Sequence, residues 1–580
     1  SSLLLEQVEK VIHTLDEGWV QLAVFLVDLE IFQSGWFNFN LPPDEQFNVS
    51  YVRERRTMGQ RLMAATKAAE AVGNVTDKSE QQRSQFYQEL EASGSLSDRY
   101  LPTRPVVSRI YQRDGGLTDA EFARQRLAGQ NPIVLRRVQS AEQAILQAWT
   151  NQSYKLADGT LIDLGNSASE NRLFIADYPL LQNLTTADLQ PGRYVGSPVG
   201  LFYRSQERLE PVLIQVEKGK VLTPTDADDW MRAKLYFQTA DVTHHELITH
   251  LCYTHLAMEA FTIATPRQLP SNHPLYRLLR PHLQFLLAIN TRGNAILLGE
   301  GAAIDNLMAP TRDVSLGLIN QAYRERPFAE YSLLNDIERR GIEVEFLPEF
   351  PYRDDALLLW DAIAQYTTSY LQRYYPDDQA VQQDPYLQAW AAELGAPLDT
   401  RSRAEFPQAP SWLPQELISE TGLDLPELPS YPRVPGFGEI TSLQQLIDIT
   451  TQIIFTCGPQ HAAVNFSQFD YVTYVPNAPF ALYSPPDTPS KLEELLPSPE
   501  KDLAQMQLTF ALSGIYWGQL GSSDLIQFSD KRDRQTLAEF QNALVDIEDK
   551  IKARNQFRRD ETGVEYTYLL PSRIPNSINI

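Results

Sequence analysis

Histidine is the residue type whose placement in this chain points most directly to chemistry. Six of the eight histidines lie between residues 244 and 282, and His245, His250 and His255 recur every five residues. Neutral imidazoles are common metal ligands. On an ordinary α-helix, five residues turn the chain through about 500°, so successive imidazoles stand about 140° apart. The spacing therefore predicts a shared metal only if the helix contains π-type turns, which bring residues i and i+5 into line. Otherwise these are core or surface histidines of an ordinary helix.

The hydrolytic zinc motif HExxH is absent from this run. After His245 and Glu246, the second histidine of that motif would stand at position 249, which is Thr249, and it comes one residue later at His250. This spacing excludes the common zinc-protease arrangement.

A second candidate pair, His461 and Asn465, lies far along the chain. Its spacing of four places both side chains on one face of an ordinary α-helix. A lone His/Asn pair is normally a hydrogen-bonded pair in a core. Its interpretation as a pair of metal ligands therefore depends on the histidine run.

These residues, with the C-terminal sequence Ile574-Pro575-Asn576-Ser577-Ile578-Asn579-Ile580, resemble the lipoxygenase family of non-haem iron dioxygenases. The family pattern has three histidines spaced by five, a distant His-Ala-Ala-Val-Asn, and a terminal isoleucine whose carboxylate binds iron. The resemblance covers residues 96–580 and includes Asp119–Ala123, Leu127–Pro132, Trp230, Ala233–Lys234 and His273–His282. Many members begin with a β-barrel lipid-binding domain. Residues 1–95 lack a strand pattern, which is typical of a bacterial or cyanobacterial member with a helical extension.

The resemblance assigns a role to each candidate site residue. It implies that His245 is a non-ligating neighbour and that Gln468 belongs to the inner shell around the metal. Two positions depart from the family: Glu246 replaces its usual glutamine, and Ala478 stands where some plant members have an arginine for the substrate carboxylate. The implied ligands are His250, His255, His461, Asn465 and the terminal carboxylate of Ile580.

This implied ligand set suits iron, with manganese as the alternative, better than zinc, which prefers four ligands. The resemblance implies a dioxygenase of polyunsaturated fatty acids with a cis,cis-1,4-pentadiene, free or esterified. In the family reaction an Fe(III)–hydroxide takes a hydrogen from the bis-allylic carbon, O2 adds to the radical, and a hydroperoxide is released. No catalytic side chain is expected beyond the metal site. The alternatives are an inactive lipid-binding or scaffold protein on the same fold, and a metal-dependent hydrolase.

Gly293 lies in the apolar stretch Leu283–Leu298, which is expected to be a helix lining the acyl channel or simply a core helix. Glycine inside a helix costs roughly 1 kcal/mol relative to alanine, so it needs a reason. The alternative reason is close packing or a local bend. In the resembling family this position is glycine in most R-forming enzymes and alanine in most S-forming ones. The resemblance therefore implies (R)-hydroperoxides, with Leu297 as a neighbouring wall of the oxygen pocket.

The surrounding pattern predicts a mainly α fold with a minor β component. Residues 1–95 are expected to form a helical extension, with a surface helical hairpin over 52–93, and residues 96–580 a catalytic domain. A capping box at Thr118–Glu121 opens a helix. Alternation predicts short strands over 155–164 and 212–221. The proline-rich stretches 401–440 and 476–499 are expected to be irregular connections.

Composition narrows the partners and the compartment. The 580 residues carry a net charge of −24, which makes nucleic-acid binding unfavourable. Cys252 and Cys457 are too few for a disulfide framework and are expected to be inert core residues in a reducing compartment. The start lacks the basic region of a signal peptide, so we expect a cytoplasmic protein. The apolar segment Trp19–Phe39 is too short to cross a bilayer; it is either a buried helix or an interfacial one that contacts lipid.

Overall fold

A computed structural model describes residues 43–71, 80–92, 104–150, 152–395, 434–488 and 490–580. The segment Trp19–Phe39, most of the stretch 401–440 and the predicted domain boundary at residues 95 and 96 lie outside these residues. Among the described helices, none is both long enough and apolar enough to cross a membrane.

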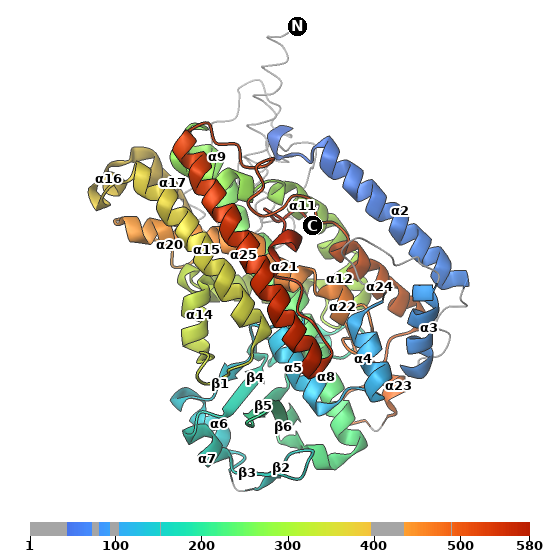
Figure 1. The fold of residues 1–580 in the computed structure, drawn as a ribbon. Coiled ribbons are helices and arrows are strands. Elements are labelled where there is room, and N and C mark those ends of the chain that lie inside the picture. The colour runs from blue at the N-terminus through green and yellow to red at the C-terminus, as the bar shows by residue number, and fades with distance from the viewer. Residues whose placement is uncertain (1–42, 72–79, 93–103, 151, 396–433, 489) are drawn as a thin grey trace.

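Helices dominate the described chain, which confirms the predicted fold class (Figure 1). The helices before residue 230 are α2 (Val49–Ala71), α3 (Glu80–Ala92), α4 (Val106–Asp114), α5 (Asp119–Ala128), α6 (Gln143–Gln147), α7 (Leu164–Ser169) and α8 (Asp228–His244). The middle of the chain forms α9 (Ala257–Gln268), α10 (Pro274–Leu279), α11 (Leu286–Gly293), α12 (Ala303–Leu307), α13 (Arg312–Glu325), α14 (Leu333–Arg340), α15 (Pro351–Tyr374), α16 (Asp378–Gln383) and α17 (Pro385–Gly395). The C-terminal part forms α20 (Leu443–Phe455), α21 (His461–Asn465), α22 (Gln468–Tyr471), α23 (Leu492–Leu495), α24 (Pro499–Ser513) and α25 (Lys531–Thr562).

The β component is a small antiparallel sheet at one end of the molecule (Figure 1). Its strand order is β1-β4-β5-β6-β7, and a separate hairpin pairs β2 with β3. Both predicted stretches contain β-structure, but neither is a single strand, because each holds parts of two strands joined by a turn at Gly159 or Gly219, where φ is positive. The strands are β1 (Arg136–Arg137), β2 (Tyr154–Lys155), β3 (Leu161–Ile162), β4 (Leu173–Asp177), β5 (Val199–Arg204), β6 (Leu209–Glu217) and β7 (Lys220–Leu222).

A long buried helix runs through the centre of the molecule. It begins as α8, continues as the π-helical segment η7 (His245–Leu256) and ends as α9. The structure thus contains the π-type turns that the five-residue histidine spacing requires. Almost every side chain of η7 is buried, so packing on all sides offsets the poorer hydrogen-bond geometry of a π-helix.

The ends of two other helices carry smaller corrections. At the start of α5, the Thr118 hydroxyl accepts a hydrogen bond from the Glu121 N–H, as predicted. The carboxylate of Glu121, however, pairs with Arg124 rather than completing the capping box. The predicted helix Leu283–Leu298 begins only at Leu286, because Phe285 has φ +68°, and its last turn is the π-helical segment η9 (Asn294–Leu298).

The long helix α15 packs against both α20 and α25 (Figure 1). Buried ion pairs join them: Arg373 of α15 contacts Asp533 of α25, and Arg558 of α25 contacts Asp355 of α15 at 2.8 Å. This arrangement fixes α20 and, directly after it, the segment that carries His461.

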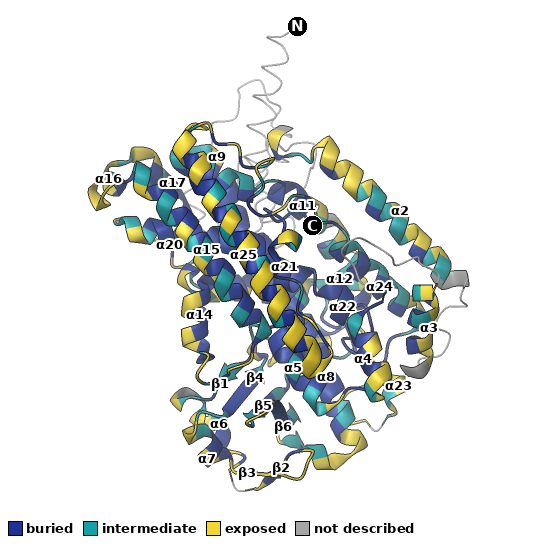
Figure 2. Cartoon of the chain, viewed as in Figure 1, coloured by how far each residue is buried: buried dark blue, intermediate teal, exposed yellow. Residues whose placement is uncertain are grey.

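Helices α2 and α3 lie on the flank of the molecule, with their outer faces exposed and their inner faces buried (Figure 2). Tyr51 of α2 and Tyr87 of α3 are fully buried in the same hydrophobic cluster as the central helix. The stretch 476–499 is mostly irregular, as predicted, with the single short helix α23.

Candidate metal centre and the cavity beside it

Three histidine side chains meet at the centre of the molecule. His250 and His255 come from the π-helical segment η7, and His461 begins α21. One ring nitrogen from each lies within 4.8 Å of the others, and all three residues are buried. The Nε2 atoms of His255 and His461 are 3.1 Å apart, and the buried Nε2 of His250 accepts no hydrogen bond from any described residue. A buried polar atom without a partner is costly, and a metal ion in this cluster would satisfy it.

The orientation of His255 is set by Asn290 of α11. The Nδ1–H of His255 donates to the Asn290 Oδ1 at 3.0 Å, and the Asn290 Nδ2 donates to the His255 carbonyl at 3.0 Å. This tautomer leaves the Nε2 lone pair free to bind a metal. Sequence reasoning missed Asn290, although a buried amide in an otherwise apolar stretch is a signal that could have found it.

Asn465 lies one helical turn after His461, on the same face of α21. Its side chain lies close to that of His250, and its Nδ2 donates to the Leu512 carbonyl at 2.8 Å. The Gln468 Nε2 donates to the Asn465 Oδ1 at 3.0 Å. The two predicted residues Asn465 and Gln468 thus lie beside the histidine cluster, and their hydrogen bond identifies the Asn465 Oδ1 as an acceptor.

The C-terminal segment is threaded into the core. Residues 574–580 are buried, and the Ile580 backbone lies within hydrogen-bonding reach of His461. Two asparagines hold the segment: Asn576 accepts from the Gly521 N–H at 3.0 Å, and Asn579 donates to the Trp517 carbonyl at 3.0 Å. The hydroxyl of Tyr51 donates to the Asn579 carbonyl. Helix α2 therefore helps to position the chain end beside the cluster.

Burial keeps the three imidazoles neutral. It lowers the pKa of His250, lowers that of His255 to about 3, and lowers that of His461 well below its ordinary value. Burial alone would raise the pKa of Glu246, but the neighbouring His245 and His250 lower it to about 2. The carboxylate of Glu246 faces His245 Nδ1 at 3.3 Å and His250 Nδ1 at 3.8 Å.

His245 lies outside the cluster of three. Its Nε2 is 2.7 Å from the Val464 carbonyl, so it ties the central helix to α21. The two cysteines are buried, and burial raises the pKa of both thiols, which bears out inert packing for Cys252 and Cys457.

A narrow cavity of about 140 Å³ opens beside the cluster. His250, His255 and Ile580 line it together with apolar side chains from α11, η9, α12 and α24. Gly293 and Leu297 also line it, and among the described residues a Cβ added at Gly293 would meet only the Leu297 Cδ1, at 4.0 Å.

Two arginines that the sequence did not single out, Arg55 of α2 and Arg292 of α11, line the same cavity. Ala478 is buried and is not among the residues that line it. Arg55 lies over the rings of Phe47 and Tyr51, at 4.3 and 4.9 Å from their centroids. In the described part of the chain, neither arginine has a carboxylate within ion-pair distance.

The profile of the lipoxygenase family matches residues 60–412 and 433–571. The chain belongs to the lipoxygenase family. It is 32% identical over 479 residues to the hydroperoxide isomerase ALOXE3 of Rattus norvegicus, covering 80% of this chain and 62% of that protein. It is 32% identical over 499 residues to the linoleate 9/13-lipoxygenase of Pseudomonas aeruginosa, covering 80% of this chain and 66% of the relative.

Solved lipoxygenase structures share the fold. A calcium-dependent 11R-lipoxygenase matches with a TM-score of 0.74 and 29% identity, over 94% of this chain and 76% of that one. A lipoxygenase variant in complex with arachidonate matches with a TM-score of 0.76 and 26% identity, over 94% of this chain and 77% of that one. This chain spans less than two thirds of the first relative's length, and its described part has the lipoxygenase fold.

Proposed function

We propose that this lipoxygenase is a dioxygenase that inserts O2 into polyunsaturated fatty acids with a cis,cis-1,4-pentadiene and yields hydroperoxides. The observation that carries the proposal is the convergence of three buried, neutral imidazoles on the wall of an apolar cavity. Such a site combines metal ligands with a place for an acyl chain. The relatives support the same chemistry, since one is named a linoleate lipoxygenase.

The metal that suits the site is non-haem iron, with manganese as the alternative. Nitrogen and oxygen donors without thiolate favour these ions. Iron, when bound, supplies the one-electron oxidation that removes a hydrogen atom from the bis-allylic carbon. The protein fixes the ligand orientation through Asn290 and Gln468, and its apolar walls keep water from the reacting carbon. The residues that would hold the metal are His250, His255, His461, Asn465 and the carboxylate of Ile580.

Arg55 and Arg292 are proposed to bind the substrate carboxylate. Burial lowers the pKa of Arg292, and the positive charge of Arg55 lowers it further, so the two guanidiniums repel each other across the cavity. An oxyanion between them relieves that repulsion and gains charge-assisted hydrogen bonds. Their position on α2 and α11 would replace the arginine that some plant members carry where this chain has Ala478.

The stereochemistry is proposed to be R. The space beside Gly293, bounded by Leu297, gives O2 room at one end of the pentadienyl radical. A methyl group in that space would fill it and direct O2 to the other end.

The exposed outer face of α2 is proposed to face lipid. Val49, Val52 and Met63 of α2 are 75%, 43% and 62% exposed, and Ile296 beside the cavity is 44% exposed. Exposed arginines of α2 at positions 53 and 56 accompany them, although the chain is strongly acidic. Apolar and basic side chains together favour an anionic lipid surface. The segment Trp19–Phe39 of the proposed extension 1–95 is a second candidate for this contact.

The deciding experiment combines metal analysis with turnover of linoleic acid. We expect bound iron or manganese, conjugated-diene absorbance and matching O2 uptake, and a raised KM for Arg292→Gln. Protein without either metal and without diene formation contradicts the proposal and favours an inactive lipid-binding protein. Since one relative is named a hydroperoxide isomerase, fatty-acid hydroperoxide is tested in parallel. Consumption of hydroperoxide without O2 uptake from linoleate would assign that second activity instead.

A further inference from the structure

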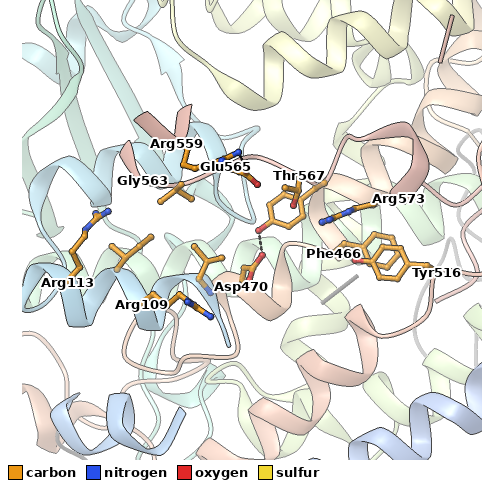
Figure 3. A pocket seen from close by; sticks show the side chains of 14 residues that line it. Arg109, Arg113, Phe466, Asp470, Tyr516, Arg559, Gly563, Glu565, Thr567 and Arg573 are labelled. Atoms are coloured by element: carbon orange, nitrogen blue, oxygen red, sulfur yellow. Dashed lines mark hydrogen bonds and ion pairs between the residues drawn. The ribbon is translucent and has the colours of Figure 1, made fainter. Parts of the chain in front are cut away.

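A second cavity of about 730 Å³ shares no lining residue with the cavity at the metal centre. Its volume is within the ~300–1,000 Å³ range of small-molecule sites. It lies between α4, the C-terminal end of α25 and the short helix η12 (Pro571–Arg573), as Figure 3 shows. We propose that this arginine cavity binds an organic oxyanion, a carboxylate or phosphate on a flat apolar body, and that the bound anion acts as an effector of the metal centre.

Four arginines provide the charge. Figure 3 shows Arg109 and Arg113 of α4 on one side of the cavity, Arg559 of α25 on the opposite side and Arg573 at one end. The side chains of Arg109, Arg113 and Arg559 are 52%, 50% and 53% exposed, and they pair with Glu91, Asp114 and Glu565 respectively. Water screens the exposed ion pairs of Arg109 and Arg559, so these pairs are weak. Arg113 holds Asp114 through two hydrogen bonds and also donates to the Thr562 carbonyl at 3.0 Å. A guanidinium has five N–H donors, so an incoming oxyanion can still accept hydrogen bonds from Arg113 and can compete for those of Arg109 and Arg559.

Arg573 adds a cation whose charge is not balanced by direct contact. Within the described ranges, no carboxylate lies at ion-pair distance from its guanidinium. The wall also contains two carboxyl groups. Asp470 is buried and accepts hydrogen bonds from the Tyr568 hydroxyl and, at 3.2 Å, from the Val106 N–H (Figure 3). Glu565 is 38% exposed and pairs with Arg559. The four guanidiniums of the lining therefore outnumber its two carboxyl groups, in a chain whose net charge is −24.

The remaining wall is apolar and aromatic, which fits the body of the ligand. Phe466 and Tyr516 are stacked, with ring centroids 4.1 Å apart and planes 19° apart. Flat apolar groups pack well against such a pair.

Two walls of the cavity lead directly to proposed metal ligands. Phe466 follows Asn465, and its ring centroid is 6.3 Å from that of His461. Arg573 immediately precedes the buried segment 574–580 that ends at Ile580. A ligand that contacts both Phe466 and Arg573 therefore acts on two of the chain segments that form the centre. This effector role rests on the proposed function, whereas binding itself does not.

Binding is tested by isothermal titration calorimetry of the full chain with phenyl phosphate and benzoate, and with benzyl alcohol as a neutral probe. We expect saturable binding of one or both anions and none of the alcohol; the stronger anion identifies the head group. Arg573→Gln and Arg113→Gln should each weaken binding about tenfold or more, because each removes charge-assisted hydrogen bonds. Two variants are used so that a folding defect in one leaves the other informative.

Two matched arginine variants locate the binding. Arg532→Gln removes an exposed arginine paired with Asp530 away from the cavity, and Arg292→Gln removes one beside the metal centre. Both should bind the anion as the wild type does. The proposed site is overturned if the wild type shows no saturable binding, or if Arg573→Gln and Arg113→Gln both bind the anion as tightly as the wild type. Loss of binding only in Arg292→Gln assigns the anion to the metal-centre cavity and also overturns it.

The effector role is tested separately with linoleate turnover. Adding the anion should change the KM or kcat of the wild type at least twofold. Adding it to Arg573→Gln should change neither constant of that variant. Binding at the arginine cavity with no change in either constant overturns the coupling. If the protein shows no turnover at all, the proposed function fails while the calorimetric result still decides the site.

Discussion

Replacing Asn290 with leucine tests whether a hydrogen bond outside the ligand set controls metal affinity. Asn290 is buried, accepts from the His255 Nδ1–H at 3.0 Å and donates to the His255 carbonyl at 3.0 Å. Leucine has a similar volume but can make neither hydrogen bond. Without this partner, His255 is free to carry its proton on Nε2, where the proton blocks metal binding.

The expected loss follows from the role of that hydrogen bond. Removing the partner of a metal-binding histidine typically lowers metal affinity about 10–100-fold, which corresponds to about 1.4–2.7 kcal/mol. The metal-free protein should also be less stable by about 1–3 kcal/mol, because buried polar groups of His255 lose their partner. The two effects are measured apart, by chelator competition followed by metal analysis and by thermal unfolding of metal-free protein.

Asn555→Leu is the matched control. Asn555 is also buried and likewise exchanges two hydrogen bonds with one backbone residue, to the Tyr566 carbonyl at 2.9 Å and from the Tyr566 N–H at 2.8 Å, away from the histidine cluster. It also accepts a hydrogen bond from the Arg558 Nη1 at 3.1 Å. It should lose similar stability and keep wild-type metal affinity. Wild-type metal affinity in Asn290→Leu, or an equal loss of metal affinity in Asn555→Leu, would refute this role for Asn290.

Four further predictions concern other parts of the molecule. One glycine added after Ile580 should abolish activity and metal binding; a fully active, metal-loaded product would contradict the carboxylate ligand. Gly293→Ala should shift part of the product from R to S at another carbon with unchanged metal content, since the added Cβ has room beside Leu297; chiral chromatography decides. Burial lowers the pKa of His282 to about 4, so between pH 6.5 and 4 only the unfolded chain takes up this proton and stability falls with pH. Between pH 7 and 5, the free energy of unfolding of His282→Gln should therefore fall by about 2 kcal/mol less than that of the wild type. Denaturant unfolding measures both, and an equal fall in the two proteins would contradict this prediction. Deleting residues 1–42, which leaves α2 intact, should lower liposome co-sedimentation; unfolding would instead support a buried helix.

The part of the site that could be predicted is the part whose spacing is unusual. A five-residue histidine repeat is compatible with a shared metal only on a π-helix, and η7 provides it. Spacing of four placed His461 and Asn465 on one helical face, and α21 has that face. In both cases the spacing along one helix already determines whether the two side chains can share a metal.

The missed residues are those whose role depends on distant contacts. Asn290 is positioned by its hydrogen bonds to a different helix, and Tyr51 by a contact with a residue 528 positions away in sequence. Arg55 and Arg292 meet only because α2 lies against the cavity. Alternation continues across the turns at Gly159 and Gly219, so the sequence pattern predicts one strand in each stretch. Only the pairing of the strands shows where each one ends.

The π-helical segment also determines where the central helix can change in length. Deleting one residue between His250 and His255 would leave a spacing of four, which an ordinary α-helix already aligns. The two imidazoles could then still meet, because the deletion removes the extra residue that a π-type turn contains. The α-helical segment α9 has no such turn to shorten, so residues beyond a deletion there would rotate by about 100° relative to the preceding turns. The fully buried Phe261 would then turn away from its present neighbours. The same one-residue deletion therefore preserves the register of the helix in η7 and breaks it in α9.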